Sequence, residues 1–218
     1  MRLYIHSHGK YLSKPNSDIS KLKEELKSIS QKPYRRINKF IYLSLIGAIK
    51  CGANAQIDKD TAIYLATNYG SSSSTVSSLS QLYIEKTLPM PLDFINTAAN
   101  IGGFYVASHF ELLSKNICIS SDIDSFQQAL ELAHLDIQSN EIQSALVGGV
   151  DETIEPLEEF YRYTPLPNSE LLMEGSCWLF VSASKDGAIG EVSFELDDGS
   201  DFVVYDAGYQ GNKIENNI

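Results

Sequence analysis

The sequence lacks the features that would place the chain in a membrane or outside the cell. Its longest mainly apolar stretch covers residues 40–49, about half of the roughly 20 residues that a spanning helix needs. The first twelve residues alternate and carry two histidines and a lysine, unlike a secretion signal. The three cysteines are far apart and form no CxxC motif, unlike a disulfide framework or a zinc site (Cys51, Cys118 and Cys177). We therefore expect a cytoplasmic protein with reduced cysteines and no membrane span.

Basic residues are scarce. The chain has 17 Lys and Arg against 28 Asp and Glu, a formal net charge of −11 and a pI near 4.8. This balance argues against nucleic acid or an anionic membrane surface as the main partner. With 218 residues, 43% of them apolar, we expect one domain over residues 1–218.

Sequence motifs for nucleotide binding, metal binding or hydrolysis are missing. The glycine pairs in NIGGF and LVGGV fit neither a dinucleotide-binding nor a P-loop pattern, and no GxSxG surrounds Ser125. Cys118 lies in an apolar segment, where burial raises a thiol pKa and makes it inert. His6 and His8 share one face of the predicted first strand and could bind a metal, but we interpret them as a surface pair. His109 and His134 have no acidic or thiol partner at ligand spacing, and the acidic residues between 151 and 159 are best interpreted as a solvated helix face. We expect no metal and no cofactor.

Short apolar runs alternate with segments of helical period. Residues 71–74, four serines after Gly70, predict a helix start, and the prolines of residues 88–94 predict a loop. The residues 95–113 predict an interior helix. Strands are predicted at 1–12, 61–67, 115–121, 144–150, 176–182 and 201–205, and further helices at 19–29, at 34–51 and from 125. This alternation predicts an α/β layered domain with a mainly parallel sheet.

The order of these segments resembles the N-terminal half of β-ketoacyl synthases of the thiolase fold. YRRINKFIYLSLIGAIKCGA is similar to the family's R-M-D-R-F helix, and TAIYLATNYGSSSS to its strand and glycine-rich turn. The stretch from INTAANIGG to SSDIDSF resembles the family's segment that leads up to the nucleophile elbow and includes it. ALVGGVDE and MEGSCWLFVS resemble two later strands. The resemblance implies a truncated thiolase-like fold, layered sheet and helices, with residues 201–218 a candidate remnant of the C-terminal half.

The departures from the family pattern concern the catalytic residues. The resemblance puts Ile123 where a synthase carries its acyl-accepting cysteine, and a hydrocarbon cannot form a thioester. DFVVYDAGYQGN is similar to the family's histidine-bearing strand, and this places Gly208 at the histidine position. The resemblance therefore implies a catalytically inactive subunit. A stand-alone acyl-thioester transferase or hydrolase that uses Ser125, Cys118 or His109 is the alternative, and a pure scaffold is a third.

A ketosynthase-like chain without its nucleophile resembles the chain length factors of type II polyketide synthases, in particular the short ones of aryl polyene pathways. The resemblance implies a heterodimer, or a higher assembly, with an active β-ketoacyl synthase. It implies only indirect contact with an acyl carrier protein. The candidates for limiting chain length in the acyl tunnel are Tyr69, Gly70, Phe94, Phe104 and Tyr105. The candidates for an intermolecular antiparallel strand contact are Asn116, Ile117, Cys118, Ile119, Ser120 and Ser121.

Overall fold

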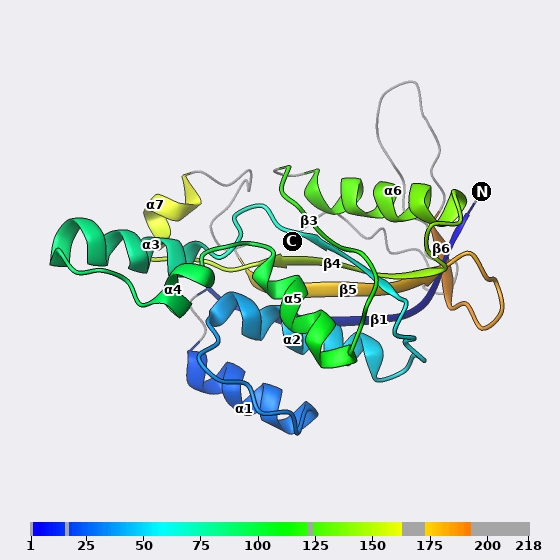
Figure 1. Ribbon diagram of the computed structural model, residues 1–218, viewed down its shortest axis with the longest axis horizontal. Helices are drawn as coiled ribbons and strands as arrows, with labels where there is room; N and C mark the ends of the chain where they lie inside the picture. Colours follow the sequence, from blue (N-terminus) through cyan, green and yellow to red (C-terminus); the bar gives the residue numbers. More distant parts are fainter. Residues whose placement is uncertain (1, 16–17, 122–123, 163–172, 193–218) are drawn as a thin grey trace.

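The computed structural model describes residues 2–15, 18–121, 124–162 and 173–192. They form one six-stranded mixed sheet with helices on both faces, in the strand order β3-β2-β4-β5-β1-β6 (Figure 1). The strands are β1 Leu3–Ser13, β2 Ala62–Ala66, β3 Asn116–Ile119, β4 Ser144–Asp151, β5 Glu174–Ser182 and β6 Gly190–Val192. The helices are α1 Ile19–Ile29, α2 Lys39–Gly52, α3 Ser72–Ser80, the π-helix η1 Gln81–Glu85, α4 Pro91–Ile95, α5 Ile101–Phe110, α6 Ser125–Gln138 and α7 Leu157–Tyr161. The predicted α/β layered, thiolase-like class is confirmed.

The prediction of a mainly parallel sheet is wrong. β2 is parallel to β3 and β4, but β5 is antiparallel to β4, and β1 is antiparallel to both β5 and β6. A strand buried on both faces reads as a continuous apolar run in either orientation, so the sequence pattern does not distinguish the two. The predicted strand at 201–205 lies outside the described residues.

Helix α2 is the centre of one side of the sheet. It is apolar on every face because it packs on β1, β4 and β5 and is itself covered by α1 and α5. Gly9 of β1 lets the two elements approach closely, since a Cβ there would collide with the backbone of α2 at Gly47 and Cys51. On the other side of the sheet, α6 packs its apolar stripe on β2 and β4. Both cores therefore hold β2 and β4 in fixed positions, with their carboxyl ends next to each other.

Two predicted helix boundaries are wrong, and one short helix was not predicted. α2 begins at Lys39, not at residue 34, because Asn38 caps it by accepting from the Ile41 amide at 2.9 Å. Residues 91–95 form α4 where a loop was predicted, with Pro91 in the first turn, where its missing N–H costs nothing. α5 begins at Ile101 and is not interior: Gly102, Gly103 and Val106 are buried, but Phe104 is 59% exposed. No described helix has the length and hydropathy needed to cross a membrane.

Candidate functional site

Strand β3 lies at one edge of the sheet. It is hydrogen-bonded to β2, from Ile63 opposite Asn116 to Ala66 opposite Ile119, and no other described strand pairs with its outer side. Asn116 is exposed and Ile117 to Ile119 are half-buried. An edge strand presents unpaired backbone N–H and C=O groups, which pair readily with another strand. The predicted interface residues 116–119 are therefore placed where a second chain could extend the sheet.

A projecting segment follows strand β2, which is paired with β3. We call residues 72–95, which comprise α3, η1 and α4, the arm; it extends away from the sheet in Figure 1. Of the 17 large apolar side chains that are exposed among the described residues, 10 belong to the arm and an eleventh is Phe104 of α5. Those of the arm are Val76, Leu79, Leu82, Tyr83, Ile84, Leu88, Met90, Leu92, Phe94 and Ile95. An exposed apolar surface of this extent marks a protein or ligand contact.

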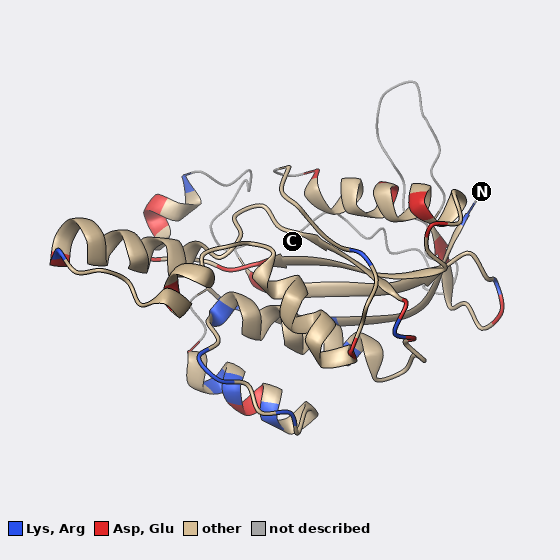
Figure 2. Cartoon of the chain, in the orientation of Figure 1, with Lys and Arg blue, Asp and Glu red and all other residues tan. Residues whose placement is uncertain are grey.

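Charge is almost absent from the same part of the chain. Residues 61–110 contain Glu85, Lys86 and Asp93 as their charged residues, whereas charged residues make up 21% of the whole sequence. Figure 2 shows the arm almost free of Lys, Arg, Asp and Glu, in contrast to α1. Depletion of charge together with exposed aromatic and aliphatic side chains is the composition of an interface core. The arm and α5 therefore have the character of a surface that another chain covers.

Both ends of the arm are held by Asn38, the residue that caps α2. Its side-chain Nδ2 lies 2.7 Å from the hydroxyls of Ser71 and Ser74, at the start of α3. The same nitrogen lies 3.1 Å from the carbonyl of Asn96, just after α4. The Asn96 side chain in turn donates to the Arg36 carbonyl at 3.1 Å. One side chain thus fixes the direction of the arm relative to the core.

Two buried carboxylates at the end of β4 hold the turn before α3. Asp151 accepts from the Thr67 hydroxyl at 2.8 Å and from the amides of Asn68 and Tyr69 at 2.9 and 3.1 Å. Glu152 accepts from the amide and the hydroxyl of Ser73, both at 2.7 Å. A carboxylate in the first turn of a helix binds free amides and complements the helix dipole. Our prediction that these two residues belong to a solvated face is wrong.

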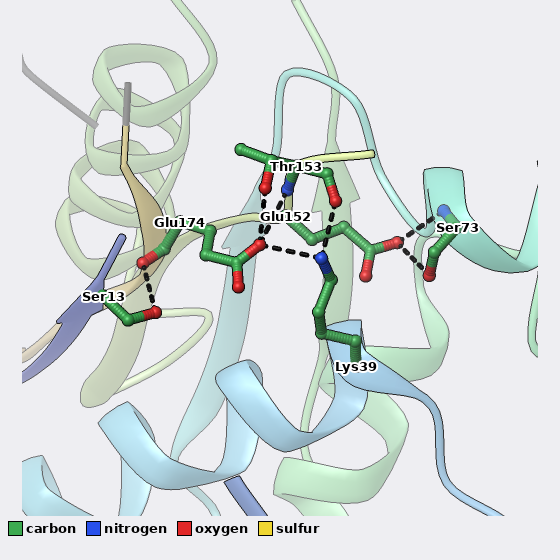
Figure 3. A network of polar contacts seen from close by, with 6 residues as sticks. All are labelled: Ser13, Lys39, Ser73, Glu152, Thr153 and Glu174. Carbon is green, nitrogen blue, oxygen red and sulfur yellow. Dashed lines mark hydrogen bonds and ion pairs between the residues drawn. The ribbon is translucent and has the colours of Figure 1, made fainter. Parts of the chain in front are cut away.

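A lysine and a second glutamate complete this buried network (Figure 3). Lys39 is 8% exposed, and its Nζ lies 2.8 Å from Glu174 Oε2 and 2.6 Å from the Thr153 carbonyl. Glu174 also accepts from the amide and hydroxyl of Thr153. In Figure 3 the Lys39 ammonium lies between Glu174 and Glu152. The lysine thus compensates buried negative charge from β4 and β5 at the root of the arm.

Burial raises the pKa of Asp151 to about 6, although its hydrogen bonds with Tyr69, Thr67 and Asn68 oppose the shift. In the unfolded chain the group titrates near its usual value, so the folded chain binds a proton first as the pH falls. The free energy of unfolding should therefore rise by up to about 3 kcal/mol from Asp151 between about pH 7 and about pH 4. Asp151→Asn keeps an acceptor oxygen, and urea unfolding at several pH values should show a flatter profile. Glu158→Gln, an exposed carboxylate of α7, is the control; equal profiles for Asp151→Asn and wild type would contradict the assignment.

The residues considered for independent catalysis do not form a nucleophile and base pair. Burial raises the pKa of Cys118 to about 11, so its thiol stays protonated at neutral pH. Ser125 is buried at the start of α6, accepts from the Ser121 amide at 2.8 Å and donates to the Thr67 carbonyl at 3.2 Å. His109 lies on α5, where its Nδ1 is 2.5 Å from the Tyr34 hydroxyl, and burial lowers its pKa to about 4. Ser125 and His109 thus have hydrogen-bond partners that explain their positions structurally, and Cys118 is explained by its burial.

The predicted tunnel residues fall into two groups. Phe94 of the arm and Phe104 of α5 are 67% and 59% exposed, and Phe104 meets Tyr105 edge to face at 5.5 Å. Tyr69 packs edge to face on Phe160 of α7 at 5.0 Å instead. Gly70 is buried with φ +61°, and a Cβ there would meet Ala99 at 3.0 Å. Of the other predicted site residues, Ser120 is exposed and Ser121 half-buried, and Ile123 and Gly208 lie outside the described residues.

Residues 6–165 match the family of the β-ketoacyl synthase N-terminal domain, so the chain belongs to this family. No match is found among proteins of curated function. In the part of the chain that the structure describes, no three His, Cys, Asp or Glu residues are grouped so that they could hold a metal ion.

Three solved structures illustrate the likeness. The ketosynthase (ApeO) in complex with its chain length factor (ApeC) from Xenorhabdus doucetiae matches with a TM-score of 0.60 and 16% identity, over 84% of this chain and 80% of that one. The ishigamide ketosynthase/chain length factor matches at 0.68 and 15%, over 91% and 69%. AntDE:AntF, a type II polyketide synthase acyl carrier protein in complex with its ketosynthase bound to the hexaketide, matches at 0.62 and 13%, over 88% and 62%. Identities this low establish the fold alone.

Sequence reasoning missed the buried network and the arm. Lys39, Glu152 and Glu174 are close in space, but 113 and 22 residues separate them along the chain, as their numbers show. The available signal for the arm was the scarcity of charge over residues 61–110.

Proposed function

We propose that this chain is a non-catalytic subunit of the chain-length-factor type, which pairs with an active ketosynthase in polyketide chain elongation. Membership of the β-ketoacyl synthase family supports the general class. The observation that carries the proposal is the combination of a sheet edge at β3, unpaired among the described strands, with an apolar, nearly uncharged arm. Obligate partner interfaces have this composition and bury large areas.

The non-catalytic character rests on the elbow sequence SSDIDSF, which carries Ile123 where the family's reactive cysteine is matched. Aspartates at 122 and 124 would also oppose a thiolate at this point of the chain. The raised pKa of Cys118 makes the thiol of the preceding strand an unsuitable substitute. The ketosynthase partner would therefore supply the nucleophile and its histidines.

The partner would pair through residues 116–121 and cover the arm. Antiparallel pairing of β3 with the partner's equivalent strand would make one continuous sheet across two chains. Solved complexes of a ketosynthase with a chain length factor share the fold of this chain. By the resemblance set out above, the acyl chain would be an aryl polyene intermediate.

Co-expression with a candidate ketosynthase tests the pairing. A stable complex should elute as one peak in size-exclusion chromatography, and it should elongate acyl thioesters. The purified chain alone should not elongate acyl thioesters. A complex assembled with a ketosynthase variant that lacks its reactive cysteine should also be inactive. Turnover by this chain alone, abolished by changing Ser125 or Cys118, would instead support a stand-alone acyltransferase or hydrolase.

A change at the exposed aromatic residues should alter product length. We propose that Phe94 and Phe104 limit the length of the acyl chain in the tunnel. Phe94→Ala or Phe104→Ala removes a bulky ring there, so longer products are expected. Mass spectrometry of products from the intact complex measures the distribution. Leu135→Ala, at an exposed apolar side chain of α6, is a matched control. If both phenylalanine variants gave the wild-type distribution of product lengths, the chain would act as a scaffold without influence on product length.

A further inference from the structure

The arm is joined to the rest of the molecule mainly at its root. Its helices pack on one another, α3 on η1 and on α4, and their contacts with the described helices and strands outside the arm are sparse. Figure 1 shows the arm projecting away from the sheet, with its root near the start of α2. A segment of this kind changes its direction easily unless hydrogen bonds or packing fix its root.

An open cleft of about 480 Å³ borders the root of the arm. Its walls include Ile19 of α1, Lys39 of α2, Ser77 of α3 and Glu155, which precedes α7. Closely packed side chains resist displacement of a helix, whereas a cleft beside α3 leaves room for it. The direction of the arm therefore depends on the polar contacts at its two ends.

The two ends of the arm are anchored differently. At the first end, Glu152 accepts from the amide and the hydroxyl of Ser73, and this contact does not involve α2. At the second end, the Asn96 carbonyl lies 3.1 Å from Asn38 Nδ2, and the Asn96 side chain donates to the Arg36 carbonyl at 3.1 Å. Both contacts of the second end thus run to residues 36–38, just before α2.

Asn38 connects the two ends through one amide group. Its Oδ1 accepts from the Ile41 amide at 2.9 Å and caps α2, so the side chain is fixed to a buried helix. Its Nδ2 carries two protons. It faces three oxygens, those of the Ser71 and Ser74 hydroxyls and of the Asn96 carbonyl. The serine end and the α4 end of the arm therefore share one donor.

We infer that Asn38 is a positioning residue that locks the arm in the orientation to which the ketosynthase binds. This rests on the proposed function. Asn38 acts through the arm, which carries 10 of the exposed large apolar side chains. A partner that binds one orientation loses apparent affinity in proportion to the fraction of molecules that adopt it. An arm released at its second end would reach that orientation less often.

The test replaces Asn38 without removing the cap of α2. Asn38→Ser keeps a good N-cap residue but is too short to bridge the two ends of the arm. Spin labels at Ile84→Cys in η1 and Leu135→Cys in α6, both exposed positions, report the distance between arm and core by pulsed electron paramagnetic resonance. In the purified chain, Asn38→Ser should broaden the distance distribution. In titrations of the unlabelled chain with the ketosynthase, Asn38→Ser should raise Kd about tenfold.

Two further variants separate the lock from the cap. Ser71→Ala/Ser74→Ala removes the hydroxyls at the first end, where Glu152 still holds Ser73, and it should stay near wild type in arm distance and affinity. Asn38→Ala also removes the cap, so it should loosen the arm as Asn38→Ser does and lower the urea midpoint further. The chain labelled without added cysteines gives the background from its native thiols.

An unaltered distance distribution in Asn38→Ser would overturn the inference, and so would a broadened distribution with wild-type affinity. The distance measurement needs no partner, which keeps the proposed function separate. Failure of the wild-type chain to bind the ketosynthase contradicts the pairing. Wild-type binding together with an unaltered arm in Asn38→Ser contradicts the lock alone.

Discussion

Replacing Leu82 and Ile84 by glutamate is expected to abolish the complex with the ketosynthase and to leave the chain folded. Both side chains belong to η1 and are 40% and 78% exposed, so the substitutions remove no core packing. In a complex, the two carboxylates would have to leave water without a compensating partner. A loss of affinity of at least about 100-fold is therefore expected.

Titration calorimetry or size-exclusion chromatography with the purified ketosynthase measures the effect. Leu135→Glu makes the same chemical change at a 57% exposed leucine of α6 and should leave the affinity unchanged. Circular dichroism should give the same spectrum for all variants. If the arm variant binds as well as wild type, the arm is not part of the interface, and β3 alone would have to account for it.

Lys39→Met should be the most destabilising single substitution in the polar network. The ammonium of Lys39 lies 2.8 Å from Glu174 Oε2, and both side chains are at most 9% exposed. Its removal leaves Glu174 and Glu152 buried near each other without a cation. Breaking a buried ion pair from one side costs about 3–5 kcal/mol. Urea unfolding of the purified chain or its complex measures the loss.

A matched substitution separates burial from charge. Lys50→Met removes a partly exposed pair with Glu25, so about 1 kcal/mol or less is expected. Lys39→Met/Glu174→Gln removes both charges of the buried pair and should recover part of the stability lost in Lys39→Met. Equal stability for Lys39→Met and Lys50→Met would show that the buried pair is not what holds the root of the arm.

Local patterns predicted much of the layered fold. The four serines after Gly70 do begin α3, and the short apolar runs at 61–67 and 144–150 do form β2 and β4. These features depend on neighbouring residues, whose preference and spacing appear directly in the sequence. The extent of α5 was overestimated because residues 96–100, Asn-Thr-Ala-Ala-Asn, carry no proline or glycine to mark the turn that the backbone makes there.

The candidate site depended on contacts that no local pattern contains. Asp151 and Glu152 belong to a run of acidic residues typical of a solvated helix. The hydrogen bonds that offset part of the cost of burying them come from Thr67, just after β2, and Ser73 of α3, far away in the sequence. Lys39 opens an apolar helix, where a lysine ordinarily faces water. The exposure of Phe94 and Phe104 likewise depends on how α4 and α5 pack on the rest of the chain. Such features follow from tertiary packing.

The open side of β3 has a consequence for how the chain must be produced. An edge strand that no other described strand pairs with, together with an exposed apolar arm, favours self-association when a partner is missing. Synthesis in excess of the ketosynthase would therefore favour self-association of the unpartnered chain, and matched, simultaneous translation of the two chains would reduce it. In the proposed heterodimer, the supply of this protein would thus be tied to that of the ketosynthase through the surface that joins the two chains.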